Sequence, residues 1–444
     1  MVVQPRSGLT RRQVLRAGVG TVGAATVGAP LISGCAPAGG ASAQEFDFWH
    51  LLSGGDGIKM QDLIDSANAA NSTYQARPTV LSWGKPYYTK LAMASAGGRA
   101  PDLAIMHSSR VPGYAPGGLL DPWDMDLLAE FGVTEQNFPA PLWRTGFSDG
   151  ELYAVALDAH PTIMMYNTDI CEQAGVLGQD GQLQEIDSPE AFLDVGRAIQ
   201  EVTGVHGLSY GYLGDASQMW RVFYTFYRQL GAEMVLTPGE PAQVDSDAAA
   251  QALEFMQQLL DGTVSATNSD YGNAVAEFAT GESGLFFTGV WELPTMRTAE
   301  LPVDAQTIPF VFGTPAAYGD SHSFVLPHQD NPDPDKRREV YRFASDLLKS
   351  SLSWAEAGHI PSYLPVTESS EYRDLMPQAH YANAADILNY DPPAWFTGSG
   401  SNFHGYFAEY VQGVLLDKSD AADGFDGFIG RVNGLLDMPN PVAG

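Results

Sequence analysis

Histidine, tryptophan and carboxylate side chains are the residues of this 444-residue chain with the clearest capacity for chemistry. Its nine histidines include no pair at the spacing that places two ligands on one helix face, and the sequence has no HExxH pattern and no cysteine cluster. Asp124 and Asp126 lie two residues apart, which does not by itself indicate the facing carboxylates of a glycosidase. No Gly-x-Ser-x-Gly elbow occurs either. We therefore predict no catalytic residue, no metal site and no cofactor.

The N-terminal residues have the pattern of an export signal. Residues 1–34 contain four arginines and no acid. Thr10–Leu15 resembles the twin-arginine export motif, although Val14 stands where the motif usually has Phe. Leu31–Cys35 resembles a bacterial lipobox, in which the cysteine thiol carries the lipid. We expect residues 1–34 to be a signal peptide of the twin-arginine (Tat) type and Cys35 to bear acyl chains such as palmitate.

A transmembrane helix is the alternative interpretation of the same segment. Such a helix needs about 20 predominantly apolar residues. The apolar stretch from Ala17 to Ile32 is shorter and is broken by four glycines and Pro30. We therefore predict a cleaved signal, followed by a lipid-anchored flexible tether over residues 35–45, which are mostly small. After cleavage Cys171 is the only cysteine without a lipid, and we expect it to be a buried small hydrophobe.

Length and charge restrict the classes of protein that this chain can belong to. Residues 35–444 are too many for one hydrophobic core, so two domains or lobes are expected. Residues 1–34 hold four of the 23 basic residues and none of the 53 acids, so the mature net charge is near −34. A surface of this charge is repelled by phosphate backbones, which argues against nucleic-acid binding.

Hydrophobic periodicity predicts an alternation of strands and helices. In the first part of the chain, strands are expected at 46–49, 79–83 and 103–106, with helices near 60–67 and at 87–96, the pattern of a mostly parallel α/β sheet. A second α/β series follows, with a helix opened by Ser188 as N-cap and Pro189 at the first helical position. Its other expected strands lie at 162–166, 207–212, 284–287 and 323–326, and its other helices at 217–229, 248–260 and 337–349.

Five passages resemble, in order, the ABC-transporter extracellular solute-binding proteins that bind sugars and oligosaccharides, the family of the maltose-binding proteins. They are the opening strand Phe46–His50, the Gly-x-x-Pro-Asp passage Gly98–Ala104, the crossing formed by Tyr153–Asp158 and Tyr166–Asp169, the Gly-x-Trp segment Phe278–Trp291, and the Gly-x-x-Pro turn Gly358–Ser362. The resemblance covers nearly the whole mature chain. It implies an α/β, two-lobed periplasmic-binding-protein type II fold with a hinge and an interlobe ligand cleft. Lobe one is then expected at 46–156 plus 321–350, and lobe two at 157–320 plus 351–444.

A neutral sugar presents hydroxyl groups around its ring and C–H patches on its faces, so its site needs flat aromatic and planar polar side chains. Trp291 matches the stacking tryptophan of the family, with a core tryptophan as the alternative. Asp158 matches an acid that accepts hydroxyl hydrogen bonds, with a cap or turn acid as the alternative.

Further ligand-binding candidates come from two groups. One group follows lobe-one strands, where parallel sheets place ligands: His50, His107, Ser109 and Arg110. Arg110 and Ser109 match family contact positions, but some members of the family have an acid where this chain has Ser109. The second group is supported by residue type alone: His160, Trp220, His322, Tyr363, Trp395 and His404.

The sequence thus predicts a monomeric, lipid-anchored extracytoplasmic receptor that captures a sugar and delivers it to a membrane permease of the ABC type, without catalysis. A binding protein for another solute, such as a polyamine, an amino acid or a metal, would have the same fold with a different cleft. A secreted glycosidase is the other alternative, and it would need two convergent carboxylates.

Overall fold

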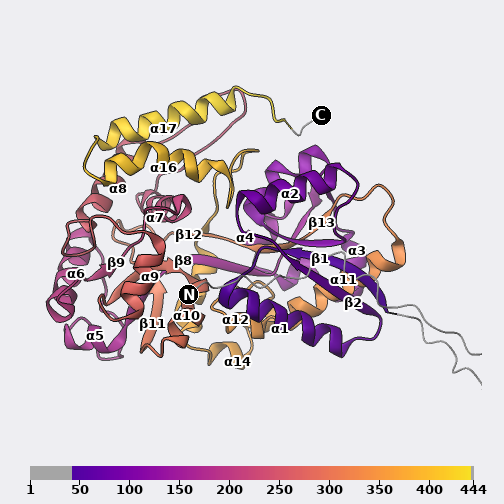
Figure 1. Ribbon diagram of the computed structural model, residues 1–444, viewed down its shortest axis with the longest axis horizontal. Coiled ribbons are helices and arrows are strands. Elements are labelled where there is room, and N and C mark those ends of the chain that lie inside the picture. Colours follow the sequence, from indigo (N-terminus) through magenta and orange to yellow (C-terminus); the bar gives the residue numbers. More distant parts are fainter. Residues whose placement is uncertain (1–42, 442–444) are drawn as a thin grey trace, which may run out of the picture. The chain divides into compact units, whose positions relative to one another are not determined.

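The computed structural model describes residues 43–441, which Figure 1 draws coloured along the sequence. The predicted signal peptide, Cys35 and all but the last three residues of the predicted tether lie outside the described residues. The export and lipid predictions therefore stay predictions. The first strand begins at Gln44, two residues before the expected strand at 46–49.

The first sheet contains β2, β1, β3, β13 and β4 in that order, and β7 also pairs with β13. Its strands are β1 (Gln44–His50), β2 (Tyr74–Val80), β3 (Leu103–His107), β4 (Leu120–Asp121), β7 (Ala154–Ala156) and β13 (His322–Pro327). β1 is parallel to β2 and β3, as predicted, whereas β13 is antiparallel to β3, β4 and β7. This returning strand places His322 beside His107 at the end of β3.

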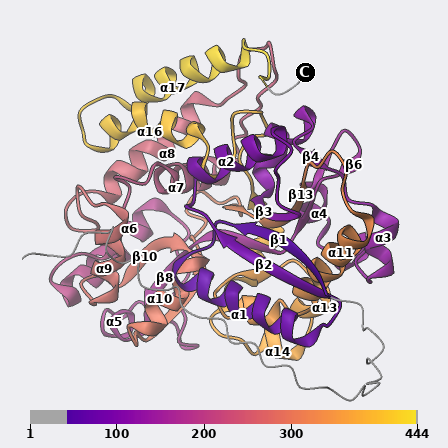
Figure 2. The same ribbon diagram turned by 45° about the vertical axis from the view of Figure 1, so that its right-hand side comes forward.

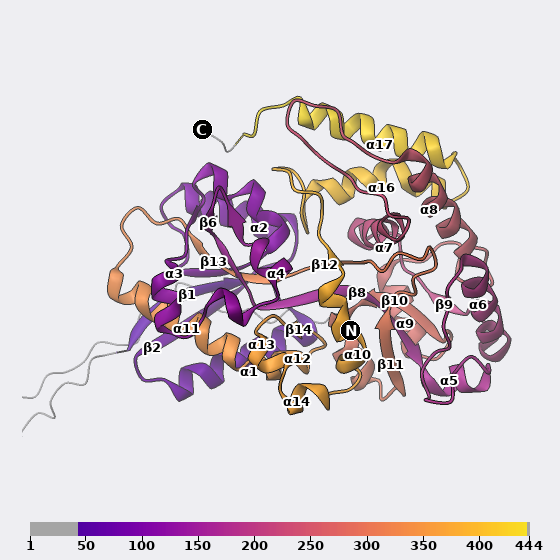
Figure 3. The ribbon, with the colours of Figure 1, turned by 180° about the vertical axis from the view of Figure 1, so that it is seen from behind.

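Helices cover both faces of this sheet (Figures 1 and 3): α1 (Gly54–Ala70) and α11 (Pro334–Lys349) lie below it in Figure 1, and α2 (Lys85–Ala96) lies above it. α1 buries Met60, Leu63 and Ile64, three of the four apolar positions from which it was predicted, and the fourth, Ala67, is half-buried. The strand expected at 79–83 is instead β2, which starts at Tyr74. Tyr74 and Ala76 are buried while Gln75 and Arg77 are exposed. This alternation of buried and exposed residues, typical of a strand, lies before residue 79, where the strand was expected to begin.

The second sheet is organised around β8 (Asp158–Asn167), whose ten residues are all buried. β10, β11, β12 and β14 pair with β8, all antiparallel to it, and β9 and β15 extend the sheet at its edges. These strands are β9 (Leu208–Ser209), β10 (Leu285–Gly289), β11 (Val303–Thr307), β12 (Ala317–Asp320), β14 (Ile360–Pro361) and β15 (Leu388–Asn389). β9 is shorter than the strand expected at 207–212, because the backbone at Gly211 packs against Asp270 and Tyr271.

The helices around the second sheet include the one predicted from its cap: Ser188 accepts a hydrogen bond from the backbone N–H of Ala191 and opens α6. The helices of this part of the chain include α5 (Thr168–Gln173), α6 (Pro189–Thr203), α7 (Ala216–Gln229), α8 (Ser246–Leu259), α9 (Tyr271–Ala279), α10 (Leu293–Thr298), α16 (Asn402–Leu415) and α17 (Ala421–Leu436).

The remaining α-helices and strands of the described chain are α3 (Met125–Glu130), α4 (Ala140–Arg144), the hairpin of β5 (Phe147–Ser148) and β6 (Glu151–Leu152), α12 (Leu352–Ala355), α13 (Leu364–Thr367), α14 (Ser370–Arg373) and α15 (Gln378–Tyr381).

The chain passes between the two sheets at points that lie side by side. β7 continues into β8 through Leu157, and β12 continues into β13 through Ser321. The N–H of Leu157 donates to the carbonyl oxygen of His322 at 2.7 Å, and its carbonyl accepts from the N–H of Ser362 at 3.1 Å. These hydrogen bonds join three chain segments where the sheets meet, which places the side chains of these segments together. The predicted lobe boundaries at 156/157 and 320/321 stay a prediction.

Buried side chains form separate clusters over the two sheets. The cluster of the first sheet includes Phe48 and Phe343, and the main cluster of the second sheet gathers α7, α8, α16 and α17 (Figure 2). Cys171 is fully buried in the latter and forms no disulfide with any residue that the structure describes. Among the described helices, none combines the length and the apolar character needed to cross a bilayer.

The aromatic centre of the first sheet gives a test of this packing. Phe343 is fully buried and lies edge-on to Phe46, Phe48 and Tyr74, with ring centroids 5.3, 5.6 and 5.4 Å away. Phe343→Ala is expected to lower the free energy of unfolding by about 3–5 kcal/mol, because it leaves a cavity among these rings. Urea denaturation followed by tryptophan fluorescence measures the change. Ile58→Ala, at a 66% exposed position, is the control and should change it by less than about 0.5 kcal/mol; equal losses would contradict this packing.

Candidate functional site

A cavity of about 400 Å³ opens where the elements of the two sheets meet. From the first sheet come the loop after β1, the end of β3 and the start of β13, and from the second sheet come β8, α7, α9 and the segment after β10. The lining residues are Leu51, Leu52, Ser53, Gly54, Gly55, Asp56, Trp83, His107, His160, Asp215, Arg221, Tyr271, Trp291, Glu292, Thr295 and His322. The cavity is thus the place where residues far apart in the sequence form one polar and aromatic surface.

Trp291 is held firmly in the wall of this cavity. Its Nε1–H donates to the Tyr271 hydroxyl at 2.8 Å, and that hydroxyl donates to Glu292 Oε1 at 2.8 Å. The ring lies against Gly289, where a Cβ atom would come within 2.0 Å of it, so this position requires glycine. The guanidinium carbon of Arg221 lies 4.7 Å from the centroid of the ring, a cation–π contact that covers one face.

Carboxylates dominate the charge of the cavity. Asp56, Asp215 and Glu292 line it together with one guanidinium group, that of Arg221. Burial raises the pKa of Glu292 above its ordinary value. The Oδ1 atom of Asp56 is buried and makes no hydrogen bond in the described part of the chain. These groups offer hydrogen-bond acceptors to hydroxyl or amino groups of a solute.

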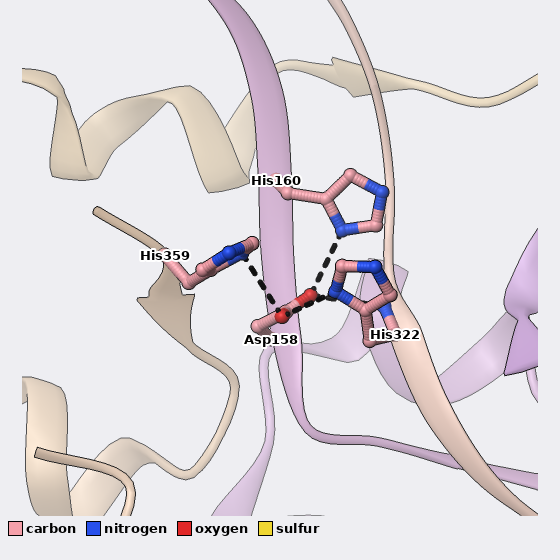
Figure 4. Close-up of side chains that lie close together, drawn as sticks. All are labelled: Asp158, His160, His322 and His359. Carbon is pink, nitrogen blue, oxygen red and sulfur yellow. Dashed lines mark hydrogen bonds and ion pairs between the residues drawn. The ribbon is translucent and has the colours of Figure 1, made fainter. Parts of the chain in front are cut away.

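Behind the cavity, three imidazole rings surround the carboxylate of Asp158 (Figure 4). The Nδ1 atom of His160 lies 3.0 Å from Oδ1, and the Nδ1 atoms of His322 and His359 lie 2.9 and 3.1 Å from Oδ2. The indole N–H of Trp354 donates to Oδ2 at 2.7 Å, and the backbone N–H of His322 donates to Oδ1 at 2.9 Å. Asp158 is fully buried, so these donors replace the water that its charge would otherwise require.

The electrostatics of this group follow from burial and from its two acids. Burial lowers the pKa of His160 to about 3, so that ring is neutral. Burial also opposes protonation of His359, but Asp56 and Asp158 outweigh it and raise the pKa of His359 to about 10. Burial disfavours the Asp158 carboxylate too, yet the surrounding histidines hold its pKa well below the ordinary value. His359 therefore supplies the positive charge that Asp158 needs.

The structure brings part of the predicted site together. Trp291, His107, His160 and His322 line the cavity, and Asp158 lies directly behind it. His107 Nδ1 lies 2.6 Å from the Tyr88 hydroxyl, which fixes its ring. His50 is buried nearby, and neither of its ring nitrogens makes a well-aligned hydrogen bond in the described part of the chain.

Six other candidates lie outside this cavity. Ser109 hydrogen-bonds to the carboxylate of Asp320 and accepts from the N–H of Ser399, while Arg110 lies over the ring of Tyr88 at 4.6 Å. Trp220 and His404 are core residues that both donate to Asp391, at 2.6 and 2.9 Å. The Tyr363 hydroxyl donates to the Gly132 carbonyl, and Trp395 lines a separate hollow with Arg110. These six side chains do not line the cavity because each of them packs against, or hydrogen-bonds to, residues elsewhere in the fold.

Sequence reasoning missed several residues of the site. The ones with polar or aromatic side chains are Ser53, Asp56, Trp83, Asp215, Arg221, Tyr271, Glu292, Thr295 and His359. Two signals were present: Glu292 directly follows Trp291, and His359 lies inside the Gly-x-x-Pro turn. Arg221 gives no such signal, because it lies on a helix, α7, of which twelve of the fourteen residues are buried.

Comparison with known proteins gives a family and a fold. The model of a family described as bacterial extracellular solute-binding protein matches residues 60–346. Among solved structures, the GacH receptor of Streptomyces glaucescens GLA.O, reported in complex with acarbose, has a TM-score of 0.75 at 16% identity over 89% of this chain and 98% of its own. Maltose-bound T. maritima MalE3 has a TM-score of 0.74 at 15% identity over 88% and 100%.

A third structure, the cyclic alpha-maltosyl-1,6-maltose binding protein from Arthrobacter globiformis, has a TM-score of 0.71 at 19% identity over 89% of this chain and 100% of its own. No curated protein sequence matches the chain. The predicted α/β fold with two lobes, a hinge and an interlobe cleft is confirmed by these structural matches.

The buried ring of His50 makes a pH-dependent contribution to stability. Burial lowers its pKa to about 4 from an ordinary value of 6.5. Between these two pH values the unfolded chain binds a proton at His50 that the folded protein does not bind. The contribution of neutral His50 is present above pH 6.5 and is lost as the pH falls from 6.5 to 4. His50→Leu is expected to lessen this acid loss and to leave stability at pH 7 equal or higher, because no well-aligned hydrogen bond is removed. Urea denaturation at several pH values between 4 and 7 measures the free energy of unfolding of the wild type and of His50→Leu. If this free energy falls equally with decreasing pH in both proteins, His50 is not the source of the acid loss.

Proposed function

Because this chain belongs to the family of bacterial extracellular solute-binding proteins, we propose that its cavity binds a carbohydrate. The observation that carries the proposal is the lining itself. Trp83, Tyr271 and Trp291 provide flat apolar surfaces for the C–H faces of a sugar ring, and Asp56 and Asp215 provide planar acceptors for its hydroxyl groups. The structures of similar fold named above include proteins bound to maltose and to acarbose, which supports this class of solute.

The size of the cavity favours a short saccharide. Its volume of about 400 Å³ lies toward the lower end of the range of ligand sites, roughly 300–1,000 Å³. Binding would bring the two lobes together around the solute, since a ligand that contacts both walls favours the closed form by its difference in affinity for the two states. We propose binding without turnover, in keeping with a family of binding proteins.

The family is extracellular, so the chain acts outside the cytoplasm. We propose that the twin-arginine signal exports it and that lipid on Cys35 retains it at the membrane, where it delivers solute to an ABC-type permease. The mature charge near −34 supports this arrangement, because so acidic a domain is repelled by anionic lipid and needs another anchor. Tethering also raises the local concentration of the receptor, so its contact with the permease need not be tight.

One observation favours a second candidate, a cationic solute such as a polyamine or a sugar that carries an amino group. The cavity holds three carboxylates, from Asp56, Asp215 and Glu292, against the single guanidinium of Arg221. An ammonium group would form charge-assisted hydrogen bonds with these acids. Affinity that falls steeply with added salt would favour the cationic solute over a neutral sugar.

Trp291 tests the carbohydrate proposal. Trp291→Ala should weaken the affinity for the sugar that stabilises the protein most in a thermal-shift panel by roughly 10- to 100-fold, because about 1.5–3 kcal/mol of apolar contact is lost. Isothermal titration calorimetry measures the change. Trp395→Ala is the matched control, since this half-buried tryptophan lies outside the cavity. If both variants bind as the wild type does, or if no carbohydrate is bound, the proposal is wrong.

Cys35 tests the membrane anchor. When the full-length chain is expressed in a bacterium with twin-arginine export, Cys35→Ala should move it from the membrane fraction to the soluble extracytoplasmic fraction, because the acyl chains can no longer be attached. Immunoblotting of both fractions, with detergent phase partition, measures this. Cys171→Ala, at the only other cysteine, should stay in the membrane fraction. A Cys35→Ala protein that remains with the membrane would rule out this anchor.

A further inference from the structure

We propose that Asp158, His160, His322 and His359 bind one divalent ion of the late first-row transition metals, Zn²⁺ in the first place. Each residue offers one ligand atom, and the four atoms all lie within 4.8 Å of one another. Two of the four ligands, His160 and His322, also line the cavity, but the ion is not the solute, so the proposal goes beyond the proposed carbohydrate function and does not depend on the identity of the solute.

The distances suit a four-coordinate ion. Zn²⁺ binds imidazole nitrogen at about 2.0–2.1 Å and carboxylate oxygen at about 2.0–2.2 Å, which places neighbouring ligand atoms of a tetrahedron about 3.3 Å apart. The Asp158 oxygens lie 2.9–3.1 Å from the three Nδ1 atoms, so small shifts of the side chains admit the ion. Figure 4 shows all three rings turned with Nδ1 toward the carboxylate.

His359 provides a second, independent observation. Its ring is fully buried between Asp158 and Asp56, with Nδ1 and Nε2 each 3.1 Å from a carboxylate oxygen. Neither contact is aligned as a hydrogen bond, so within the described residues both nitrogens have an ion-pair partner but no well-aligned hydrogen-bond acceptor. A buried polar group in this state is destabilising unless something else engages it. An ion bound at Nδ1 is such a partner.

The surroundings resemble the outer shell of a metal site. With Nδ1 on the ion, His359 presents Nε2–H to Asp56, the arrangement in which a carboxylate orients a metal-bound histidine. Trp354 and the backbone N–H of His322 hold the Asp158 carboxylate in place. The ion takes the place of the proton at Nδ1 of His359, and its two positive charges then balance the two negative charges of Asp158 and Asp56.

The ligand types decide which metal fits. Three imidazoles and one carboxylate suit Zn²⁺, Co²⁺, Ni²⁺ or Cu²⁺, whereas Mg²⁺ and Ca²⁺ prefer oxygen ligands throughout. Four protein ligands with no open position are typical of a structural site rather than a catalytic one. His160 and His322 also line the cavity, which gives the ion a route of access.

The position of the ligands gives the ion a role. Asp158 and His160 lie at the start of β8, His322 starts β13, and His359 directly precedes β14. These are the three segments that are joined by hydrogen bonds where the two sheets meet. A metal bound there would tie the three segments together and fix the two cavity histidines for contact with the solute.

Metal titration of the full chain tests the proposal. After treatment with a chelator, the protein should bind one equivalent of Zn²⁺ in calorimetry, melt at a higher temperature with it, and give with Co²⁺ the visible absorption of a four-coordinate nitrogen and oxygen site. His359→Gln and His160→Gln should abolish stoichiometric uptake, and Asp56→Asn should weaken it by about 10- to 100-fold through the outer shell. His404→Gln is the matched control: this histidine is equally buried, but it is held by Ser217 and Asp391 away from the cluster.

The outcomes separate the metal site from the sugar site. Circular dichroism shows whether each variant folds. If a variant is unfolded, the metal titration of the wild type still tests the proposal. Absence of stoichiometric binding of Zn²⁺, Co²⁺, Ni²⁺ and Cu²⁺ by wild type would overturn the metal site, as would equal uptake by folded His359→Gln and His404→Gln. Sugar titrations with and without Zn²⁺ run in parallel, so a failure of carbohydrate binding leaves the metal stoichiometry unaffected.

Discussion

The burial of one negative charge, that of Asp158, is the constraint on which the rest of the site depends. A carboxylate without water is strongly unfavourable unless donors and a positive charge surround it. The donors here come from β8, from the start of β13 and from α12, and the positive charge comes from His359 in the turn before β14. Each of these segments must therefore arrive at the same point, and the chain crossings between the two sheets are fixed by the same group.

The cavity follows from this arrangement. The rings of His160 and His322, fixed by Asp158, stack with their centroids 4.1 Å apart and form one side of the cavity. The adjacent wall is built by the segment after β10, where Gly289 permits the Trp291 ring to lie against the backbone, with the ring centroid 6.2 Å from that of His160. The histidine wall thus depends on the electrostatics of Asp158, and the Trp291 wall depends on the absence of a side chain at Gly289. Both walls present groups suited to a polar solute with apolar faces.

The sequence predicted this fold well where local signals agree with tertiary packing, as in α1 and α6. It predicted the site in part: Trp291 and His107 lie at the ends of strands, where ligands are expected, whereas His160 and His322 were predicted from residue type alone. His359 and Asp56 were missed since their role arises from pairing over about 300 residues, which no local spacing reports. A search for helical ligand spacing could not find the cluster, because Asp158 and His160 lie two apart on a strand. Ser109 and Arg110 have the expected positions, but Asp320 and Tyr88 engage their side chains.

The guanidinium of Arg221 over Trp291 has a consequence for selectivity. A solute that stacks on that face of the indole must displace the arginine, so its association is an exchange of one ring partner for another. The measured affinity then reports a difference between two contacts and not the strength of either. A compound with a flat, weakly polar face gains little from such an exchange unless it also gives the displaced guanidinium an acceptor. Under the proposed function, this contact favours molecules that combine an apolar face with an oxygen-rich edge.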